Sequence, residues 1–516
     1  RRTNLYYAQT VDGGATWSNL GSALIESQTY NWDTASLQDQ PDVKWRIELA
    51  ADPTVTDDSD NLLAVNPQRY FVNDSSLIGD LYCSQTGDDR NDGVSTNRPM
   101  ATFNTLLAVH KIEPAATLYI DTGDYLLTND FEITGDDGGS ATGAVYVTVQ
   151  GSTNGTVIGR TSRDIRATGI YINDADRVSI KDLTVTGGYY AVSLSASSYC
   201  QVSNLVIHHS VWNGIQLEAS DHTTLRRVNV HHCKGTGIYG DQSDYNQVQF
   251  STIWTNGADG VFFNGTSNAL YHSVVAFNGD DQVVLGGGSL YSRYNIACAE
   301  ATNSFCLYRV DGAYFSDYND LYSTNGASVG YYSGIQRCLA DWQAGAGQDA
   351  NSLAHDPLFV DTLAGDFHVR SLAPAGTFVT ATGSRTNFYE QSPCIDAGPV
   401  FGVVTNEPAP DGGRINLGAY GETDEASLSN TNDWLLAVSY NDGGSARGNV
   451  LLHWLNGLAE TGATVQIDYS RDAGFSWQLV TNLPATNLYC TWRTTNYIGS
   501  PLALWRLFSS TATDSV

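Results

Sequence analysis

Lysine is almost absent from this 516-residue chain, and acidic residues far outnumber basic ones. Aspartate and glutamate total 55 against 26 lysines and arginines, which gives a formal net charge of −29. Nucleic acids and anionic membrane surfaces are bound through basic patches, so the balance argues against both as partners. An acidic surface of this kind favours solubility and attracts cations. The only lysines are Lys44, Lys111, Lys181 and Lys234.

Long apolar runs are also missing, and none approaches the ~20 residues that a membrane-spanning helix requires. The eight cysteines include no Cys-x-x-Cys pair of the kind that binds zinc, although their even number permits disulfides. There is no Ser-His-Asp frame, phosphate-binding loop or dinucleotide fingerprint. The hydrophobic content of 41% is sufficient for a folded core. We therefore expect a folded protein without a membrane span and assign no catalytic residue.

A long-range repeat joins the two ends of the chain at an offset of 460 residues. The segment DGGATW at residues 12–17 matches DAGFSW at residues 472–477, and two further tryptophans match at the same offset. Three tryptophans in one ungapped register indicate two copies of one module, which we predict to be its assembly module. The tryptophans are Trp17, Trp32 and Trp45 in the first copy and Trp477, Trp492 and Trp505 in the second.

Both copies have the pattern of β-sandwich pieces, because short alternating stretches flank a glycine-containing turn. The second copy has two earlier candidate strands, at residues 434–440 and 450–455, that the first copy lacks. The first copy instead continues into a candidate strand at residues 68–73 that has no counterpart in the second. The sequence thus predicts one sandwich without its first strands and one without its last.

Three interpretations of these incomplete ends remain open. The chain is a segment of a tandem array, or each end completes a sandwich on a neighbouring copy by strand addition. Both arrangements give a head-to-tail fibre in which the partner is the protein itself. The alternative is that the ends simply pass through an ordinary linker domain.

A shorter repeat of 22–23 residues runs through the middle of the chain. Val202, Leu225, Val248 and Leu270 follow this spacing, and a second ladder beginning at Ile207 runs in parallel. The stretches are too short for helices and too regular for loops. The period is typical of one coil of a parallel β-helix, with the apolar ladders inside and roughly eight coils over residues 145–325. A leucine-rich repeat would require an LxxLxLxxN frame, which is absent.

Several stretches resemble secreted bacterial right-handed parallel β-helix proteins of the pectate-lyase-like class. Residues 82–93 (YCSQTGDDRNDG) and 98–103 (RPMATF) resemble their opening motif, in which the second part forms a short capping helix. Residues 356–360 (DPLFV), 392–398 (SPCIDAG) and 416–421 (NLGAYG) resemble the closing segment. The class contains lyases, epimerases, adhesins and structural proteins, so the resemblance implies a fold and leaves the activity open.

The resemblance implies an all-β chain with three structural parts. A right-handed parallel β-helix with an N-terminal cap is expected over residues 80–421. Immunoglobulin-like or fibronectin-like β-sandwich modules are expected at residues 1–79 and 433–516, with a linker at 422–432. Modules of this type usually serve as spacers or attachment points.

The best calcium candidates are Asp259, Asp280 and Asp281, because Asp280 follows Asp259 by 21 residues and could lie on the neighbouring coil. A lyase of this class uses aspartate-bound calcium, a lysine or arginine base, and a groove along the stacked strands. Residues 278–282 (NGDDQ) faintly resemble the calcium segment Asn-x-Asp-Asp-Gly of family nine polysaccharide lyases, with glutamine in place of glycine. No lysine follows Lys234, whereas the base of that family lies downstream. The alternative is that these aspartates shape turns between coils.

Two histidine pairs, His208–His209 and His231–His232, lie 23 residues apart and should stack on neighbouring coils. Together with Lys234 and Asp221 they are candidates for an acid–base cluster or a transition-metal site. Strand alternation predicts that one histidine of each pair points inward and the other outward. The alternative is a polar ladder on the surface.

Two further sets of candidate sites lie on loops. Asp88, Asp89 and Asp92 provide enough oxygen ligands for calcium but lack the EF-hand spacing, so a solvated turn is the alternative. Asn73, Asn154 and Asn264 open glycan-acceptor tripeptides.

The sequence therefore predicts an extracellular or cell-surface structural or adhesive protein, a subunit or repeating segment of a bacterial surface fibre assembled through its sandwich modules. No cofactor is required, and calcium is an optional ligand. The alternative is a calcium-dependent polysaccharide lyase or a glycan-binding β-helix protein, for which an extracellular glycan is the partner.

Overall fold

The structure is a computed structural model of the whole chain. It describes residues 4–11, 14–34, 40–60, 63–65, 68–162, 164, 167–400, 404–458, 462–510 and 512–515. By its internal contacts the chain divides into two units. The first comprises residues 1–161 and 170–184, and the second comprises residues 162–169 and 185–516.

The first unit begins with an antiparallel sheet in the strand order β2-β1-β3-β4, with β5 also paired to β3. Tyr6 on one face of this sheet and Trp45 on the other remain 41% and 38% exposed. Asp12 and Gly13 of the repeated turn motif lie outside the described residues. The strands are β1 (Asn4–Thr10), β2 (Ser18–Leu24), β3 (Gln40–Leu49), β4 (Asp52–Asp58) and β5 (Leu63–Val65).

The β-helix begins earlier than the sequence predicted. Strand β6 (Arg69–Val72) was expected to extend the N-terminal sandwich, but it pairs in parallel with β7 (Thr117–Ile120) of the first coil. Its consecutive residues Tyr70, Phe71 and Val72 are all buried, which a solvent-facing sandwich strand would not allow. The predicted domain boundary at residue 79 is therefore wrong.

Helix α1 (Phe103–Val109) covers the start of the first coils, as the resemblance implied. Thr102 caps its first turn, and Phe103 stacks on Phe131 with ring centroids 4.7 Å apart. The remaining strands of these coils are β8 (Gly123–Leu127), β9 (Phe131–Thr134), β10 (Val147–Gly151), β11 (Thr156–Arg160), β12 (Thr168–Asn173) and β13 (Val178–Gly187).

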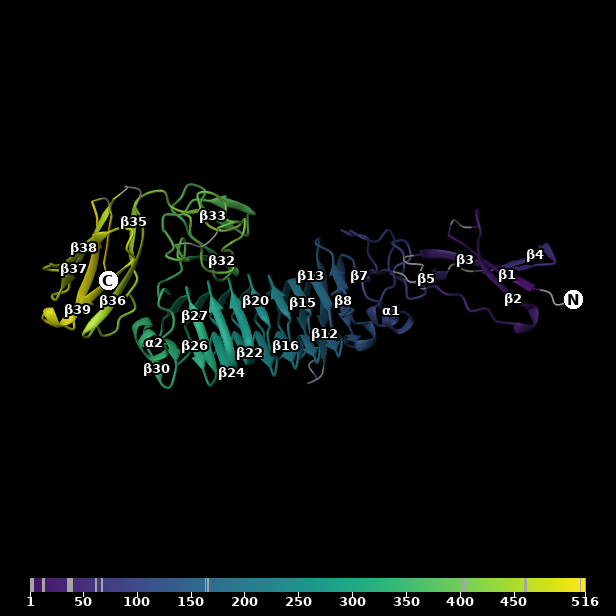
Figure 1. Cartoon of the computed structure of the whole chain (residues 1–516), viewed down its shortest axis with the longest axis horizontal. Helices are drawn as coiled ribbons and strands as arrows, with labels where there is room; N and C mark the ends of the chain where they lie inside the picture. The colour runs from purple at the N-terminus through teal and green to yellow at the C-terminus, as the bar shows by residue number, and fades with distance from the viewer. Residues whose placement is uncertain are drawn as a thin grey trace. The chain divides into compact units, whose positions relative to one another are not determined.

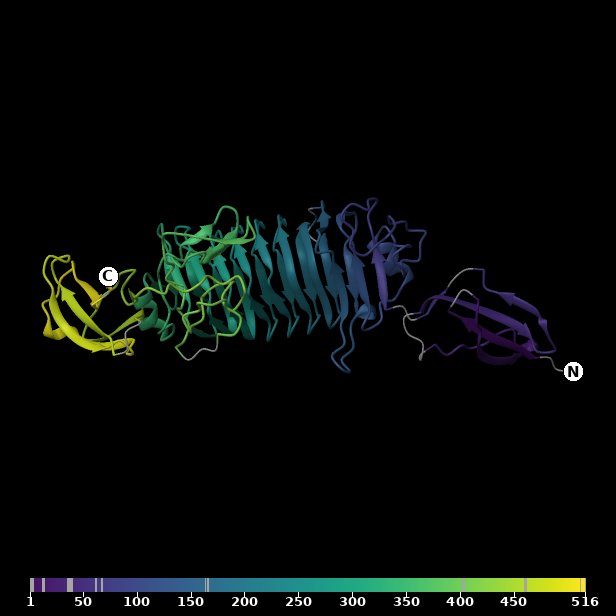
Figure 2. The same cartoon turned by 90° about the horizontal axis from the view of Figure 1, so that it is seen from above.

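Three parallel sheets form the coils of the second unit (Figures 1 and 2). Sheet A contains β14 (Tyr190–Ser195), β16 (Ile215–Glu218), β19 (Ile238–Asp241), the first parts of β22 (Val261–Tyr271) and β24 (Val283–Arg293), β26 (Phe305–Arg309) and β29 (Ser328–Tyr331). Sheet B contains the first part of β15 (Gln201–His208), β17 (Thr224–Arg226), β20 (Gln247–Gln249), the last parts of β22 and β24, and β27 (Ala313–Asp317). Sheet C contains the last part of β15, β18 (Asn229–His231), β21 (Thr252–Trp254), β23 (Val274–Ala276), β25 (Ile296–Ala299) and β28 (Asp320–Ser323).

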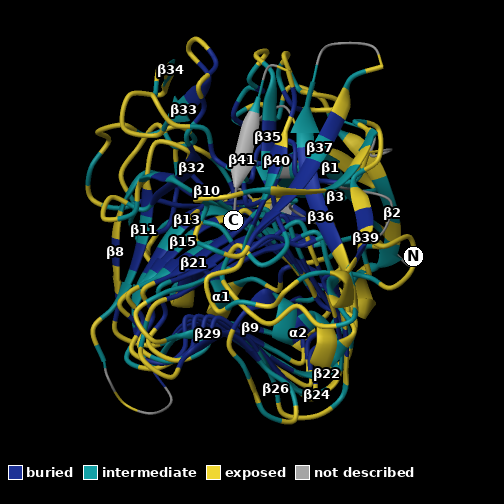
Figure 3. Cartoon of the chain, turned by 90° about the vertical axis from the view of Figure 1, so that its left-hand side faces the viewer, coloured by how far each residue is buried: buried dark blue, intermediate teal, exposed yellow. Residues whose placement is uncertain are grey.

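The predicted apolar ladders line the interior of these coils. One ladder consists of Val202, Leu225, Val248 and Leu270, which pair in that order on four successive coils. All four side chains are fully buried. The ladder that begins at Ile207 is equally buried. Figure 3 shows the buried strands inside the coils in dark blue. The prediction of a parallel β-helix is confirmed.

Buried asparagines and serines shape the turns between the sheets. Asn256 and Asn278 lie on neighbouring coils, and the side-chain oxygen of Asn278 accepts hydrogen bonds from the backbone N–H and side-chain amide of Asn256, both at 3.0 Å. Asn295 and Asn319 repeat the arrangement. A buried backbone N–H without a partner costs free energy, so these ladders satisfy the turn backbone from one coil to the next.

A C-terminal segment closes the β-helix and covers the outer face of sheet C from β21 to β25. Helix α2 (Leu339–Ala346) places Trp342 against the last coil, where Gly330 leaves room for the indole. Beyond it, a buried cluster joins Trp254 and Ile296 of sheet C to Phe367 and Leu417. The short strands here are β30 (Ile335–Gln336), β31 (Phe359–Asp361), β32 (Asp366–Val369), β33 (Thr377–Val379) and β34 (Ser384–Thr386).

The segment 422–432 is part of this closing region rather than a linker. The Ser427 hydroxyl bonds to the carbonyl of Val369, and the N–H of Leu428 donates to the carbonyl of Gly376 at 2.8 Å. Arg385 donates to two carbonyls of the same segment. The predicted linker is therefore wrong, because its backbone groups are satisfied by the closing region.

The C-terminal module contains two antiparallel sheets that enclose a core. The first has the order β35-β36-β39 and the second β38-β37-β40-β41. The fully buried Trp454 lies in this core. The strands are β35 (Trp434–Ala437), β36 (Asn449–Gly457), β37 (Thr464–Ser470), β38 (Gln478–Pro484), β39 (Tyr489–Arg493), β40 (Leu504–Phe508) and β41 (Thr513–Ser515).

The 460-residue repeat is confirmed at the level of strand register. Strand β1 pairs with β2 as β37 pairs with β38, residue for residue at that offset. Even the register shift is shared, between Tyr7 and Ala8 in one copy and between Ile467 and Asp468 in the other. The β1–β3 pairing likewise matches β37–β40. The two chain ends are copies of one sheet.

All eight cysteines are free thiols, and seven of them are buried. The disulfides that their number permitted do not form. No helix among the residues that the structure describes is long and apolar enough to cross a membrane.

Candidate functional site

The outer face of sheet A presents two side-chain rows that run from coil to coil. Because side chains alternate along a strand, the residues between the inward ladder positions point outward. The rings of Tyr239 and Phe262 stack at 4.6 Å with an interplanar angle of 5°, and those of Tyr308 and Tyr331 stack at 4.9 Å. The first row consists of Ser193, Gln216, Tyr239, Phe262, Val284, Tyr308 and Tyr331.

The second row is acidic and polar. Ser195, Glu218, Asp241 and Asn264 stand in register on successive coils. The Asn264 amide donates to Asp241 Oδ1 at 2.7 Å, while Glu218 is exposed. In the first row Tyr239, Phe262, Tyr308 and Tyr331 are half-buried, whereas Ser193, Gln216 and Val284 are buried. Sheet A therefore offers half-buried aromatic rings beside a short row with two carboxylates and an amide.

Asp259 and Asp281 stand beside these rows, at the turn that leads into sheet A. The N–H of Asp281 donates to Asp259 Oδ1 at 3.2 Å, and the N–H of Phe305 donates to Asp281 Oδ1 at 2.9 Å. Burial raises the pKa of Asp259 to about 6 and that of Asp281 to about 7, with further contributions from the neighbouring carboxylates. Burial, followed by the charges of Asp241 and Asp259, raises the pKa of Tyr239.

The three calcium candidates thus lie close together, but not as an open ligand set. Asp259 and Asp281 each accept a backbone N–H from the next coil, and Asp280 is exposed. Among the described residues, no group of three or more His, Cys, Asp or Glu side chains is placed to hold a metal ion. Asp259 and Asp281 thus link backbone groups of neighbouring coils, and calcium binding at the three positions stays a prediction.

The loop aspartates near the start of the β-helix also have structural partners. Asp89 accepts hydrogen bonds from the N–H groups of Ala101 and Thr102 at 3.0 and 2.9 Å, and so holds the start of α1. Asp88 pairs with Arg90, whose hydrogen bonds lower the pKa of the Asp88 carboxyl to about 2. Asp92 lies 3.0 Å from the Arg98 guanidinium. The three carboxylates act separately.

The histidine pairs form a surface ladder. His208 stacks on His231 at 5.3 Å, and the ladder continues from His231 to Trp254 at 4.8 Å. The prediction that one member of each pair points inward is wrong. His209 and His232 have φ values of 60° and 55°, and this left-handed turn keeps both side chains of each pair outside the core. Burial lowers the pKa of His231 to about 4, so its imidazole is neutral near pH 7.

The three sequons differ in accessibility. Asn73 is fully buried, and its amide donates to Asp80 at 2.7 Å and to the Gln85 carbonyl at 2.9 Å. A glycan at Asn73 is incompatible with this fold. Asn154 is exposed and Asn264 half-buried, and glycosylation at these two positions stays a prediction.

The repeated tryptophans are placed by the repeated sheet. The Arg46 guanidinium lies 4.0 Å from the ring centroid of Trp17, and its counterpart Arg506 lies 4.3 Å from Trp477. In the C-terminal module Trp492 and Trp505 are buried at 6% and 4% exposure. In the first unit, Trp32 is half-buried and Trp45 is exposed.

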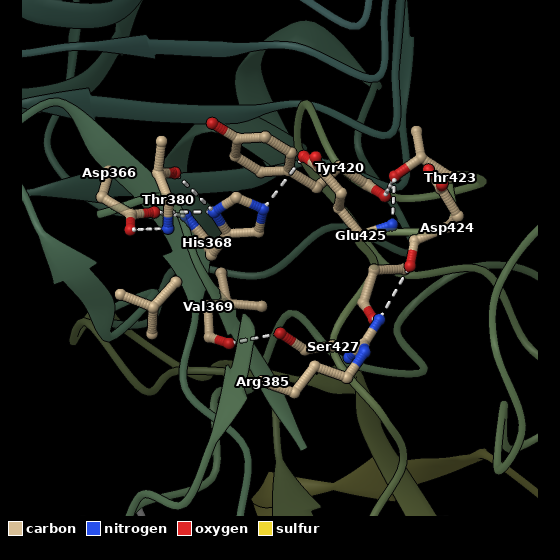
Figure 4. Close-up of polar contacts among 12 residues, drawn as sticks. Asp366, His368, Val369, Thr380, Arg385, Tyr420, Thr423, Asp424, Glu425 and Ser427 are labelled. Carbon is tan, nitrogen blue, oxygen red and sulfur yellow. Dashed lines mark hydrogen bonds and ion pairs between the residues drawn. The ribbon is translucent and has the colours of Figure 1, made fainter. Parts of the chain in front are cut away.

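Sequence reasoning missed a buried cluster around His368 in the closing region (Figure 4). Asp366 Oδ1 lies 2.6 Å from His368 Nδ1, and Glu425 Oε2 lies 3.4 Å from Nε2. Burial lowers the pKa of His368, whereas its bonds to Asp366 and Glu425 raise it. The bonds have the larger effect, so the pKa lies above its usual value. The ring of Tyr420 stacks on the imidazole at 3.5 Å.

A cavity of 440 Å³ adjoins this cluster, with Glu425, Asp424 and Tyr420 on one side and Arg227 and Phe250 on the other. The pattern Asp366-Phe-His368 is a usable sequence signal, because residues two apart on a strand share a face. The contribution of Glu425, 57 positions further along, is set by the fold alone. The cluster joins β32 to residues 420–425 within the closing segment.

Comparisons with known proteins agree with the fold. Residues 144–297 match the family model described as a right handed beta helix region. The central region is a right-handed parallel β-helix. No curated protein matches the sequence.

Among solved structures, the chain is similar to pectate lyase Pel9A, with 16% identity and a TM-score of 0.45 over 68% of this chain and 96% of that one. It is similar to an alginate lyase from Paenibacillus sp. str. FPU-7, with 15% identity and a TM-score of 0.35 over 46% and 95% of the two chains. It is also similar to the enzymatically active domain of tailspike protein 2 of bacteriophage CBA120, with 10% identity and a TM-score of 0.34 over 78% and 66%.

Proposed function

We propose that the right-handed β-helix binds a neutral glycan on the outer face of sheet A. The observation that supports this is the pair of in-register rows, one with Tyr239 and Tyr308 and the other with Glu218 and Asp241. Sugar hydroxyls donate hydrogen bonds to carboxylates, and such charge-assisted bonds are stronger than neutral ones. The tyrosine hydroxyls of the first row can both donate and accept.

The repeat of the β-helix favours a polymer as the ligand. The first row adds a member on each coil at a spacing of about 4.8 Å, and the second row runs along four of these coils, from Ser195 to Asn264. A chain of sugar units lying along the coil axis would therefore meet similar groups repeatedly, and several weak contacts would add. A small single sugar would use only a fraction of this face.

The negative charge of sheet A favours neutral glycans over acidic ones as ligands. Glu218 and Asp241 point outward from sheet A, and the whole chain carries a formal charge of −29. A polyuronate would be repelled by such a face. The predicted calcium-dependent lyase would need a cation to reverse this repulsion, and it stays a prediction together with fibre assembly and the extracellular location.

The test is calorimetric titration of the full chain with a panel of neutral and acidic oligosaccharides. We expect neutral ligands to bind, and binding to be little changed between about 0.05 M and 0.5 M salt. Tyr239→Ala should weaken binding about tenfold, which corresponds to about 1.4 kcal/mol. The matched control is Tyr245→Ala, because Tyr245 is 49% exposed in a separate stack with His222. Equal loss in both variants, or binding of acidic ligands alone, would contradict the proposal.

A second candidate function is cleavage of the bound glycan by acid–base chemistry. The observation in its favour is that Asp259 and Asp281 have pKa values of about 6 and about 7, within the range of a general acid near neutral pH. They lie on neighbouring coils, where the N–H of Asp281 donates to Asp259 Oδ1 at 3.2 Å. Release of reducing ends that is lost in Asp281→Asn, with binding retained, would support this function. Binding without any release would exclude it.

A further inference from the structure

The N-terminal sheet has an apolar face that no second sheet covers among the described residues of its unit. Its strands β1 and β3 place Leu5, Tyr7, Trp45 and Ile47 on one side by alternation. Trp45 is 38% exposed, and the other three are only half-buried. A hollow of 310 Å³ lies on this side, lined by Tyr7, Trp32, Trp45 and Ile47 among others.

The C-terminal copy shows the same face covered. The counterparts of Leu5, Tyr7 and Ile47 are Val465, Ile467 and Leu507, and all three are fully buried. Trp505, the counterpart of Trp45, is 4% exposed. The chain thus contains one sheet in two states, covered and uncovered, with identical strand register.

The cover in the C-terminal module comes mainly from strands β35 and β36. Leu435 and Ala437 of β35 and Leu452 and Trp454 of β36 fill the core against β37 and β40. Strand β39 joins this sheet by pairing with β36 alone. Residues 29–33, which correspond to β39, form no strand in the first unit. Instead Tyr30 stacks on Tyr7 at 4.3 Å.

We propose that the uncovered face of the N-terminal sheet is a docking site for a further copy of the β35–β36 strand pair, residues 433–460. Docking places the counterparts of Leu452 and Trp454 over Trp45 and Ile47. It also gives residues 29–33 a strand to pair with, as β39 has in β36. The occupant is fixed by the repeat, because the same surface carries this strand pair elsewhere in the same chain. The site is independent of the glycan-binding face.

The test joins an extra copy of residues 433–460 directly in front of Arg1 in the full chain. Thr461 is the counterpart of Arg1 at the 460-residue offset. The new junction therefore has the same spacing as the one between Glu460 and Thr461 in the C-terminal module. Amide hydrogen exchange is measured for residues 29–33 and 45–47. We expect exchange at both segments to slow at least tenfold, with β39 in the same molecule as the reference for full protection.

Matched variants of the added copy sharpen the test. Leu452→Asp places a charge on the face that is fully buried in the C-terminal module, and it should abolish the new protection. Leu451→Asp is the control, because Leu451 on the same strand is 53% exposed, and it should leave the protection intact. Unchanged exchange in β39 verifies that each variant is folded.

Two outcomes would overturn the proposal. One is an added copy that leaves exchange at residues 29–33 unchanged while β39 keeps its protection. The other is protection of residues 29–33 that the Leu452→Asp copy gives as fully as the unsubstituted copy, which would show that the buried face of β36 does not dock on this sheet. Glycan titration of the same proteins reports separately on sheet A.

Discussion

Asp320 is a buried acid whose replacement should stabilise the protein in a pH-dependent way. Its side chain is fully buried at the start of β28. It accepts the N–H of His355 at 3.0 Å and lies 3.1 Å from Cys394 Sγ. Burial raises the pKa of the Asp320 carboxyl from 3.8 to about 7. The folded protein therefore holds this proton over a range in which the unfolded chain has released it.

The direction of the effect follows from this difference in pKa. Between pH 3.8 and about 7, unfolding releases a proton from Asp320, so the free energy of unfolding falls by about 1.4 kcal/mol for each unit of rising pH. The contribution of the bound proton to the free energy of unfolding is complete below pH 3.8 and is lost once the pH passes about 7. Three units of pKa shift correspond to a loss of about 4 kcal/mol.

Asp320→Asn keeps the shape of the neutral acid at every pH. We expect the variant to exceed the wild-type free energy of unfolding by about 4 kcal/mol at about pH 8 and by less than about 1 kcal/mol at about pH 4. Native-state hydrogen exchange of the β28 amides measures this difference, because comparison at one pH cancels the intrinsic exchange rate. Asp361→Asn, at an exposed position, is the control and should show neither effect.

A variant no more stable than the wild type at about pH 8 would refute this reasoning, because a buried ionised carboxylate is costly to keep. An equal gain at both pH values would also refute it, since the effect would then have nothing to do with ionisation.

Three other substitutions test the packing and polar contacts of the second unit. Gly240→Ala places a Cβ 2.7 Å from Cδ1 of Phe263, and thermal unfolding should show a loss of about 1–3 kcal/mol. His368→Gln leaves the Asp366 carboxylate buried without its partner, so urea unfolding should show a loss of about 3–5 kcal/mol. Since the pKa of His368 is raised, this loss should be largest below about pH 6.5 and shrink as the pH rises. Asn278→Ala removes the acceptor for the backbone N–H of Asn256 on the preceding coil. Hydrogen exchange at that turn should become faster, by a factor that corresponds to a loss of about 1–3 kcal/mol.

The sequence was most informative where one period repeats. The ladders through Val202 and Ile207 could be predicted because each coil must present the same apolar positions to one interior. The 460-residue offset predicted a shared module, and the register of β1 and β37 confirms it. In both cases the pattern recurs, so that no single position had to be interpreted alone.

The errors arose where a segment has two possible partners. Strand β6 follows the N-terminal sheet directly in the sequence, and only its pairing with β7 places it in the β-helix. His209 and His232 break the alternation because their backbone is left-handed, a choice that the neighbouring coil fixes. Residues 422–432 have the composition of a linker, yet Leu428 bonds to the closing region. Glu425 joins His368 through the same packing.

The sequence by itself determined the coil period, the inward ladders and the duplicated sheet, because these follow from local spacing and alternation. Tertiary structure decided whether the apolar face of each copy of the sheet is covered. Residues 29–33 and β39 occupy the same place in the repeat, but only β39 forms a strand, since a strand needs a hydrogen-bonded neighbour and only β36 provides one. It likewise decided that the pKa of Asp281 is raised to about 7 while that of Asp88 is lowered to about 2. The residue type is the same, and burial in one place and a guanidinium in the other set the charge.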